Sequence, residues 1–193
     1  MKYQGVLFDL DGTLTASGEG ITKSVQYALK KMGRPDLGKD RKKLEVFVGP
    51  PLLEQFMDYA GFSEEEAAEA VKYYRERYNV TGIFENQPYP GIKELLESLK
   101  EKGIMLAVAS SKPDQMVKIV LDHFHLDTYF DVIMGSDINR PKMTKAEVIF
   151  QVLEKMNCLD KREKVIMVGD RHYDVLGAKA ACLSCIGVPY GYV

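Results

Sequence analysis

The stretch VLFDLDGTLTASGEG, residues 6–20, places three apolar residues directly before two aspartates that stand two positions apart. The apolar run predicts a buried β-strand. On an extended chain Asp9 and Asp11 can point to the same side, and Gly12 lets a ligand or a metal ion approach the backbone closely. Two neighbouring carboxylates are costly to keep ionised together unless a cation lies between them or one of them holds a proton. The stretch therefore predicts a strand that ends in a site for metal binding or acid–base chemistry.

Four further apolar runs have the composition of strands that are covered on both faces. Segments with apolar residues at helical spacing lie between the later runs, at 92–102, 115–124 and 145–156. A strand followed by a helix and another strand is typical of a parallel sheet. We therefore expect an α/β fold built on a doubly wound, Rossmann-like parallel sheet. The predicted strands are residues 6–10, 104–110, 131–135, 165–169 and 183–188.

The alternation of strands and helices is interrupted after the first strand. Apolar residues at helical spacing predict a helix over 21–32, and Ser63 followed by Glu66 is a capping-box pattern for a helix that ends near Tyr78. The segment ENQPYPG, residues 85–91, is rich in turn-forming residues. We therefore expect an inserted α-helical cap domain. Its predicted range is 15–87, inserted into a core of residues 1–14 and 88–193.

Composition limits the classes of partner. A chain of 193 residues with 46% hydrophobic content can bury a sizeable core. Lysine and arginine number 26 and aspartate and glutamate 28, so the net charge of −2 argues against a nucleic-acid or anionic-membrane binder. We see no signal-peptide pattern and no apolar run near the roughly 20 residues of a membrane span, and we expect a cytoplasmic protein. The odd number of cysteines, Cys158, Cys182 and Cys185, argues against a disulfide framework.

Polar residues stand where the predicted strands end. Ser110 ends the second strand, Asp170 follows the fourth, and Lys145 begins the helix after the third. Ligands of open parallel sheets bind beyond the carboxyl ends of the strands, so we expect these residues to converge with the two aspartates of the first strand. Asp174 would share a face with Asp170 if a helix begins there, and carboxylate oxygens suit Mg²⁺. An ammonium group and a hydroxyl both suit phosphate oxygens.

Four segments carry the candidate residues: DLDGT from Asp9 to Thr13, VASSKP with Ser110, KAEVI with Lys145, and VGDRHYD with Asp170 and Asp174. In this order they resemble the motifs of the haloacid dehalogenase superfamily. The helical insertion directly after DGT resembles the capped phosphatases of that superfamily. The segments FVGPPL, residues 47–52, and YPGI, residues 89–92, are similar to its phosphoglycolate phosphatase and 5'-nucleotidase-like branch. Lys142 is a second candidate for the lysine of the third motif, but the sequence after Lys145 fits better.

The resemblance implies a covalent mechanism and a magnesium cofactor. Asp9 would attack phosphorus and form an aspartyl-phosphate, while Asp11 would protonate the leaving oxygen and then deprotonate water. Mg²⁺ would be held by the Asp9 carboxylate, the backbone carbonyl of Asp11 and Asp170. Ser110 and Lys145 would hold the phosphoryl oxygens. The supporting residues would be Asp174, Gly12 and Thr13.

We therefore expect a Mg²⁺-dependent phosphomonoesterase that acts on a small phosphorylated metabolite, similar to phosphoglycolate or a nucleoside monophosphate. A phosphomutase that uses the same aspartyl-phosphate is an alternative. A phospho-aspartate signalling or binding module without turnover is a third, but a cap of this size suits an enzyme that excludes water from small substrates. We expect no nucleic-acid or membrane partner, and a monomer or a weak homodimer.

Overall fold

The computed structural model describes residues 2–140 and 143–192, and the chain divides into two compact units. The core unit contains the described residues up to Ala16 and the segment Pro88–Gly191. The cap unit contains Ser17–Gln87 together with Tyr192. Within the core unit, Thr15 forms an isolated bridge with Pro88, so the points where the chain leaves and re-enters this unit lie side by side.

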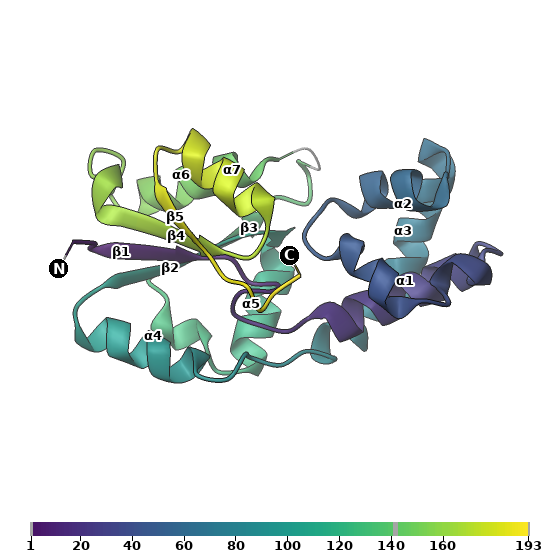
Figure 1. Ribbon diagram of the computed structural model, residues 1–193, viewed down its shortest axis with the longest axis horizontal. Helices are drawn as coiled ribbons and strands as arrows, with labels where there is room; N and C mark the ends of the chain where they lie inside the picture. The colour runs from purple at the N-terminus through teal and green to yellow at the C-terminus, as the bar shows by residue number, and fades with distance from the viewer. Residues whose placement is uncertain (1, 141–142, 193) are drawn as a thin grey trace. The chain divides into compact units, whose positions relative to one another are not determined.

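The core unit is built on a sheet of five parallel strands in the order β3-β2-β1-β4-β5 (Figure 1). All five predicted strands are present, and the expected parallel α/β fold is confirmed. Ser110 lies inside β2 and not at its end, because β2 continues to Pro113 after an irregularity in its pairing with β3. The strands are β1 (Gly5–Phe8), β2 (Met105–Pro113), β3 (Val132–Ser136), β4 (Val165–Gly169) and β5 (Ser184–Gly187).

Helices cover both faces of the sheet. The helices α6 and α7 lie on one face and α4 and α5 on the other (Figure 1). The whole of β1 is buried, and Leu7 packs with apolar residues of β2, β4, α6 and α7 in one continuous cluster. This central position holds the carboxyl end of β1 in the middle of the sheet edge. The helical elements of this unit are α4 (Ile92–Glu101), α5 (Asp114–His123), η4 (Asp127–Tyr129), α6 (Lys145–Lys155), η5 (Arg162–Lys164) and α7 (His172–Ala180).

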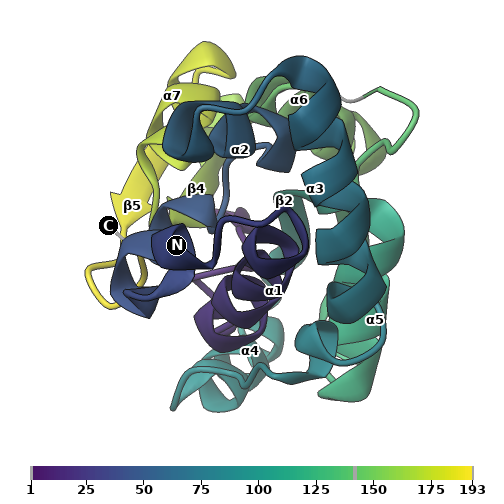
Figure 2. The same ribbon diagram turned by 90° about the vertical axis from the view of Figure 1, so that its right-hand side faces the viewer.

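The cap unit is helical, as expected for the segment inserted after the first strand. Its longest helices, α1 and α3, lie side by side (Figures 1 and 2). The predicted capping box at the start of α3 is present, since Ser63 accepts a hydrogen bond from the Glu66 N–H and the Glu66 carboxylate accepts one from the Ser63 N–H. The elements of this unit are α1 (Gly18–Lys31), η1 (Pro35–Gly38), η2 (Arg41–Phe47), α2 (Leu52–Ala60), α3 (Glu64–Tyr78) and η3 (Gly82–Phe84).

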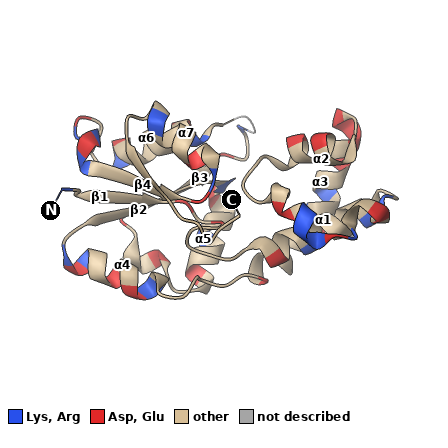
Figure 3. Cartoon of the chain, viewed as in Figure 1, with Lys and Arg blue, Asp and Glu red and all other residues tan. Residues whose placement is uncertain are grey.

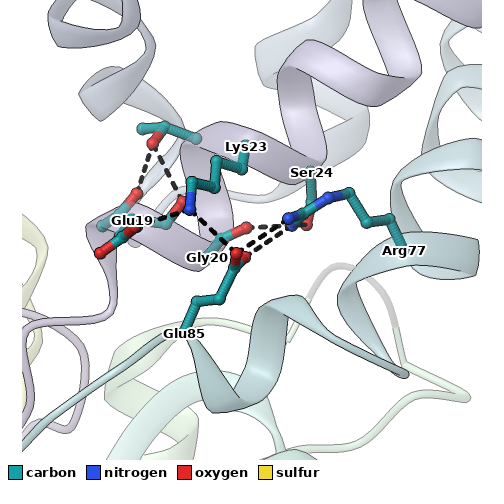
Figure 4. A network of polar contacts seen from close by, with 8 residues as sticks. Glu19, Gly20, Lys23, Ser24, Arg77 and Glu85 are labelled. Atoms are coloured by element: carbon teal, nitrogen blue, oxygen red, sulfur yellow. Dashed lines mark hydrogen bonds and ion pairs between the residues drawn. The ribbon is translucent and has the colours of Figure 1, made fainter.

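A polar network ties the end of the cap unit to its first helix (Figure 4). The Glu85 carboxylate accepts hydrogen bonds from two nitrogens of the Arg77 guanidinium, at 2.8 and 3.0 Å, and from Lys23 at 3.0 Å. Lys23 also donates to Glu19 at 2.6 Å, and Arg77 to the Ser24 hydroxyl at 3.2 Å. The Arg77 contacts, more than any other group, lower the pKa of Glu85. The network therefore joins α1, α3 and the segment that follows η3.

Two glycines let these segments approach closely at the network. A Cβ atom on Gly20 would lie 1.8 Å from the backbone oxygen of Gly82, and one on Gly82 would lie 2.6 Å from Ser24 Oγ. The Gly20 N–H also donates to the Glu85 carbonyl at 3.0 Å. Backbone atoms cannot rotate away as a flexible side chain can, so a side chain at position 20 would force α1 and η3 apart.

Charged residues of both signs are interspersed on the helices of each unit (Figure 3). Pairs such as Lys118 with Asp114 are exposed ion pairs, which typically contribute about 0–1 kcal/mol. No helix of the described residues is long and apolar enough to cross a membrane. The three cysteines are free thiols, as expected. The charges with large energetic consequences are those buried at the edge of the sheet.

We predict that Gly20→Ala lowers the free energy of unfolding by about 1–3 kcal/mol, the usual cost of overpacking, because the new methyl group meets the Gly82 backbone. Alanine ordinarily stabilises a helix by about 1 kcal/mol relative to glycine, so the expected sign is reversed. Urea denaturation would measure the change. Gly187→Ala is the control, because a Cβ atom there meets nothing within 4 Å. A Gly20→Ala protein as stable as the wild type would contradict the close packing of these segments.

Candidate active site

The loop after β1 holds two aspartates in buried positions. The Asp9 N–H donates to the Val168 carbonyl at 2.9 Å, which continues the pairing of β1 with β4 by one residue. Gly12 then adopts a φ of 90°, in the left-handed region that favours glycine, and its N–H donates to the Thr15 carbonyl at 2.8 Å. The chain turns back on itself within a few residues. As a result Asp9 and Asp11 are each only 6% exposed.

A capping box fixes the position of Lys145. The Thr144 hydroxyl accepts from the Glu147 N–H and the Glu147 carboxylate accepts from the Thr144 N–H, so α6 begins at Lys145 as predicted. The Lys145 side chain is buried, and its ammonium lies 2.7 Å from Asp9 Oδ1 and 2.7 Å from Asp174 Oδ1. One lysine therefore bridges a carboxylate that follows β1 and one from the first turn of α7.

Asp170 and Asp174 both belong to this cluster, but they do not share one face of a helix as expected. The helix α7 begins at His172, so Asp170 precedes it and the expected common helical face is wrong. Asp170 instead directly follows β4, and Gly169 leaves room for Asp174, since a Cβ atom on that glycine would lie 2.3 Å from the Asp174 carboxyl carbon. One carboxylate oxygen each from Asp9, Asp170 and Asp174 lie within 4.8 Å of one another.

Lys112 also belongs to the site, a role that was not predicted from the sequence. Its ammonium lies 2.9 Å from Asp11 Oδ2, and the two side chains are only 7% and 8% exposed. Its backbone N–H donates to the hydroxyl of Ser110 at 3.3 Å, and Ser110 is itself buried. Alternate residues of a strand point to the same side, so the spacing of Ser110 and Lys112 was the available signal. Lys142 lies outside the described residues.

Burial dominates the electrostatics of the cluster. Loss of hydration raises the pKa of Asp9 to about 7, although the charge of Lys145 opposes the shift, and the neighbouring Asp174 and Asp11 add to it. Burial alone would lower the pKa of Lys145, but the carboxylates of Asp9 and Asp174 outweigh burial and raise it. Lys145 therefore stays charged at neutral pH, whereas Asp9 exists in both the acid and the carboxylate form.

The buried charges do not balance among themselves. Among the described residues of the cluster, the four carboxylates of Asp9, Asp11, Asp170 and Asp174 outnumber the two ammonium groups of Lys112 and Lys145 by two when all are ionised. Unbalanced buried charge is costly, and a divalent cation would cancel it.

The donor set fits Mg²⁺. Three carboxylate oxygens within 4.8 Å of one another are close to the span of about 4 Å across a magnesium ion, which binds oxygen at about 2.1 Å. The buried hydroxyl of Thr13, next to the cluster in sequence, has no hydrogen-bond partner among the described residues. A buried polar atom of this kind is typical of a place where an ion, water or ligand completes the contacts.

Comparison with known proteins identifies the family of this chain. The family described as haloacid dehalogenase-like hydrolase matches residues 6–188. A 5'-nucleotidase of Pseudomonas aeruginosa is 46% identical, over all of this chain and 85% of its own length. A phosphoglycolate phosphatase of the same organism is 33% identical, over 97% of this chain and 70% of its own length.

One similar protein is named as a kinase and not as a phosphatase. Tyrosine-protein kinase PtkA of Mycobacterium tuberculosis is 38% identical over 98% of this chain, and the chain spans 63% of that protein. Among solved structures, a predicted phosphatase from Clostridium acetobutylicum has a TM-score of 0.92 and 49% identity, over all of this chain and 87% of its own. The family match over nearly the whole chain, together with these relatives, shows that this protein belongs to the haloacid dehalogenase-like hydrolases.

Proposed function

We propose that this protein is a Mg²⁺-dependent phosphomonoesterase that works through an aspartyl-phosphate on Asp9. The observation that carries the proposal is the buried cluster in which Asp9 contacts Lys145 and lies beside Asp170 and Asp174. The names of the relatives, 5'-nucleotidase and phosphoglycolate phosphatase, support a phosphate ester as substrate.

Asp9 is the nucleophile in this proposal. Asp9, Asp170 and Asp174 would hold Mg²⁺, with the backbone carbonyl of Asp11 as a further ligand. Bound Mg²⁺ supplies positive charge that lets a carboxylate and a phosphate dianion approach each other. An oxygen of Asp9 forms a bond to phosphorus while the bond from phosphorus to the leaving oxygen breaks. Buried carboxylates are poorly hydrated, which favours this attack once the site is charge-balanced.

Lys145 and Ser110 neutralise and orient the phosphoryl group. Phosphoryl transfer depends mainly on positioning and on charge neutralisation around the transferred group. Lys145 remains charged at neutral pH and lies against Asp9, so a phosphoryl group on Asp9 is within reach of a positive charge from the start. The Ser110 hydroxyl adds a donor from the neighbouring strand β2.

Asp11 moves the protons. Asp11 enters the first half of the reaction carrying a proton, which it gives to the leaving oxygen. In the second half it takes a proton back from the water that attacks the aspartyl-phosphate, and so returns to its starting form. That attack forms a bond from the water oxygen to phosphorus and releases the Asp9 carboxylate. Lys112 holds the Asp11 side chain by an ion pair of 2.9 Å, which restricts where its carboxylate points. Gly12 and Thr13 shape the loop that carries both aspartates.

We propose a small phosphorylated metabolite, similar to phosphoglycolate or a nucleoside monophosphate, as substrate. The similarity to phosphatases of both kinds supports this class, and we assign the choice of leaving group to the cap unit. A second candidate is phosphoryl transfer to an acceptor other than water. The similarity to a tyrosine-protein kinase favours a protein acceptor, and a sugar hydroxyl would make the protein a phosphomutase.

The proposed activity requires Mg²⁺, because Asp9 and Asp170 would otherwise repel a phosphate dianion. We predict that purified protein releases inorganic phosphate from one or more small phosphate esters over many turnovers. Chelation should abolish the release and added Mg²⁺ should restore it, while Ca²⁺ should substitute poorly because its coordination is larger and looser. Full activity in excess chelator would contradict the role of the cluster. Formation of an isomeric phosphate ester without free phosphate would identify a phosphomutase. Transfer of a phosphoryl group from ATP to a protein tyrosine would identify a kinase.

Asp11→Asn separates the two halves of the reaction. We predict that with p-nitrophenyl phosphate this variant gives a burst of about one nitrophenolate per enzyme, followed by turnover slowed roughly 10²- to 10⁴-fold. Nitrophenolate leaves without a proton, so the first half proceeds, whereas water attack on the aspartyl-phosphate still needs a base. Stopped-flow absorbance would measure both phases.

Matched substitutions control this experiment. Asp9→Asn should give neither burst nor turnover, and Asp160→Asn, which changes an exposed aspartate, should resemble the wild type. Steady-state rates in Asp11→Asn equal to those of the wild type, or a phosphoenzyme in Asp9→Asn, would show that the two roles are assigned wrongly.

A further inference from the structure

The segment after β5 returns to the edge of the sheet and contacts the loop that carries the aspartates. The Val188 N–H donates to the Gly169 carbonyl at 2.9 Å, which keeps the chain beside the end of β4. The Tyr190 hydroxyl donates to the Thr13 carbonyl at 3.0 Å. The ring of Tyr190 packs against that of Tyr89, with centroids 4.6 Å apart. Three separate contacts therefore hold this segment in place within the core unit.

The next residue, Gly191, packs directly against the proposed metal site. A Cβ atom on Gly191 would lie 2.4 Å from Oδ2 and from Cβ of Asp170, and 2.4 Å from the Gly12 carbonyl oxygen. Gly191 is not among the glycines with positive φ, so the backbone conformation does not require glycine there. The requirement is for space, because any side chain would occupy the position of the Asp170 carboxylate or of the Gly12 backbone.

Gly12 restricts the same carboxylate. A Cβ atom on Gly12 would lie 2.2 Å from Asp170 Oδ2, so the backbones at positions 12 and 191 both pack against one oxygen. This packing restricts the freedom of Asp170, whose carboxylate lies with those of Asp9 and Asp174. A ligand held in one place loses less entropy when it binds a metal ion.

We propose that Gly191 is a positioning residue for the metal site: the Tyr190–Gly191 segment holds the Asp170 carboxylate in place and so sets the affinity for Mg²⁺. The inference rests on the proposed role of Asp170 as a metal ligand. Gly191 lies outside the four motifs and contributes no donor atom from a side chain. Its effect is on metal binding, and the phosphate-binding groups Ser110 and Lys145 keep their positions.

Isothermal titration calorimetry with Mg²⁺ alone tests this proposal without reference to activity. Gly191→Ala should raise the Kd for Mg²⁺ by about tenfold or more, as loss of a supporting contact around a metal ligand commonly does. In assays, the Mg²⁺ concentration for half-maximal activity should rise in parallel, while KM for the phosphate ester at saturating Mg²⁺ stays within about twofold of the wild type. Gly187→Ala is the matched control and should bind Mg²⁺ normally, because the space around it is open.

Tyr190→Phe keeps the test decisive if the alanine variant folds poorly. It removes the hydrogen bond to the Thr13 carbonyl and leaves the ring, so it should weaken Mg²⁺ binding about two- to tenfold. Wild-type Mg²⁺ affinity in both variants would overturn the inference and leave the proposed function standing. A wild-type protein that binds no Mg²⁺ would overturn the proposed function, and the inference with it.

Discussion

The ammonium group of Lys145 lies 2.7 Å from an oxygen of Asp9 and 2.7 Å from an oxygen of Asp174, at a buried place on the edge of the sheet. Asp9 and Lys145 are 136 residues apart in the chain, and they meet because parallel strands deliver their carboxyl ends to one edge. The bridge cancels only part of the buried negative charge. Burial raises the pKa of Asp9, and the neighbouring carboxylates add to the shift. The remaining negative charge also suits the site to a divalent cation.

Glycine provides the space for this concentration of charge. A Cβ atom on Gly12 would meet Asp170, one on Gly169 would meet Asp174, and one on Gly177 would lie 2.9 Å from Cγ of Lys145. Each of these charged side chains therefore packs against a backbone that carries no side chain of its own. In such surroundings the carboxylates have few alternative positions, which is the condition for a precise metal and phosphate site. The proposed role of Gly191 extends the same physical rule to a segment far along the chain.

Much of the fold was predictable from local patterns. Apolar runs located all five strands, and the capping box that begins α3 was predicted, because these signals depend on residues close in sequence. The start of α6 at Lys145 was also predicted, although the capping box there was not. The convergence of Asp9, Lys145 and Asp170 also followed, since the position of strand ends in a parallel sheet is a general rule. Free thiols at all three cysteines agree with the odd count.

Other features of the site depend on tertiary structure and were not predictable. The irregular pairing of β2 with β3 extends β2 past Ser110, and a register irregularity leaves no periodic signal. Lys112, the partner of Asp11, was missed although its spacing from Ser110 was a signal, because only the three-dimensional structure shows that its side chain is buried against Asp11. The place of Asp174 was also missed. It lies in α7, which begins after Asp170, and its carboxylate contacts Lys145 directly.

Proton release on metal binding tests the central claim, that a divalent cation balances the buried carboxylates. The pKa of Asp9 is about 7 in the metal-free protein, so at pH 6 Asp9 is mostly protonated and must lose its proton to bind Mg²⁺. Calorimetric titrations in buffers of different ionisation enthalpy should therefore show release of nearly one proton per Mg²⁺ at pH 6, and almost none at pH 8.5, where Asp9 is already ionised. Asp9→Asn should remove this release. Mg²⁺ binding at pH 6 with the same heat in every buffer, or no binding at either pH, would contradict the account.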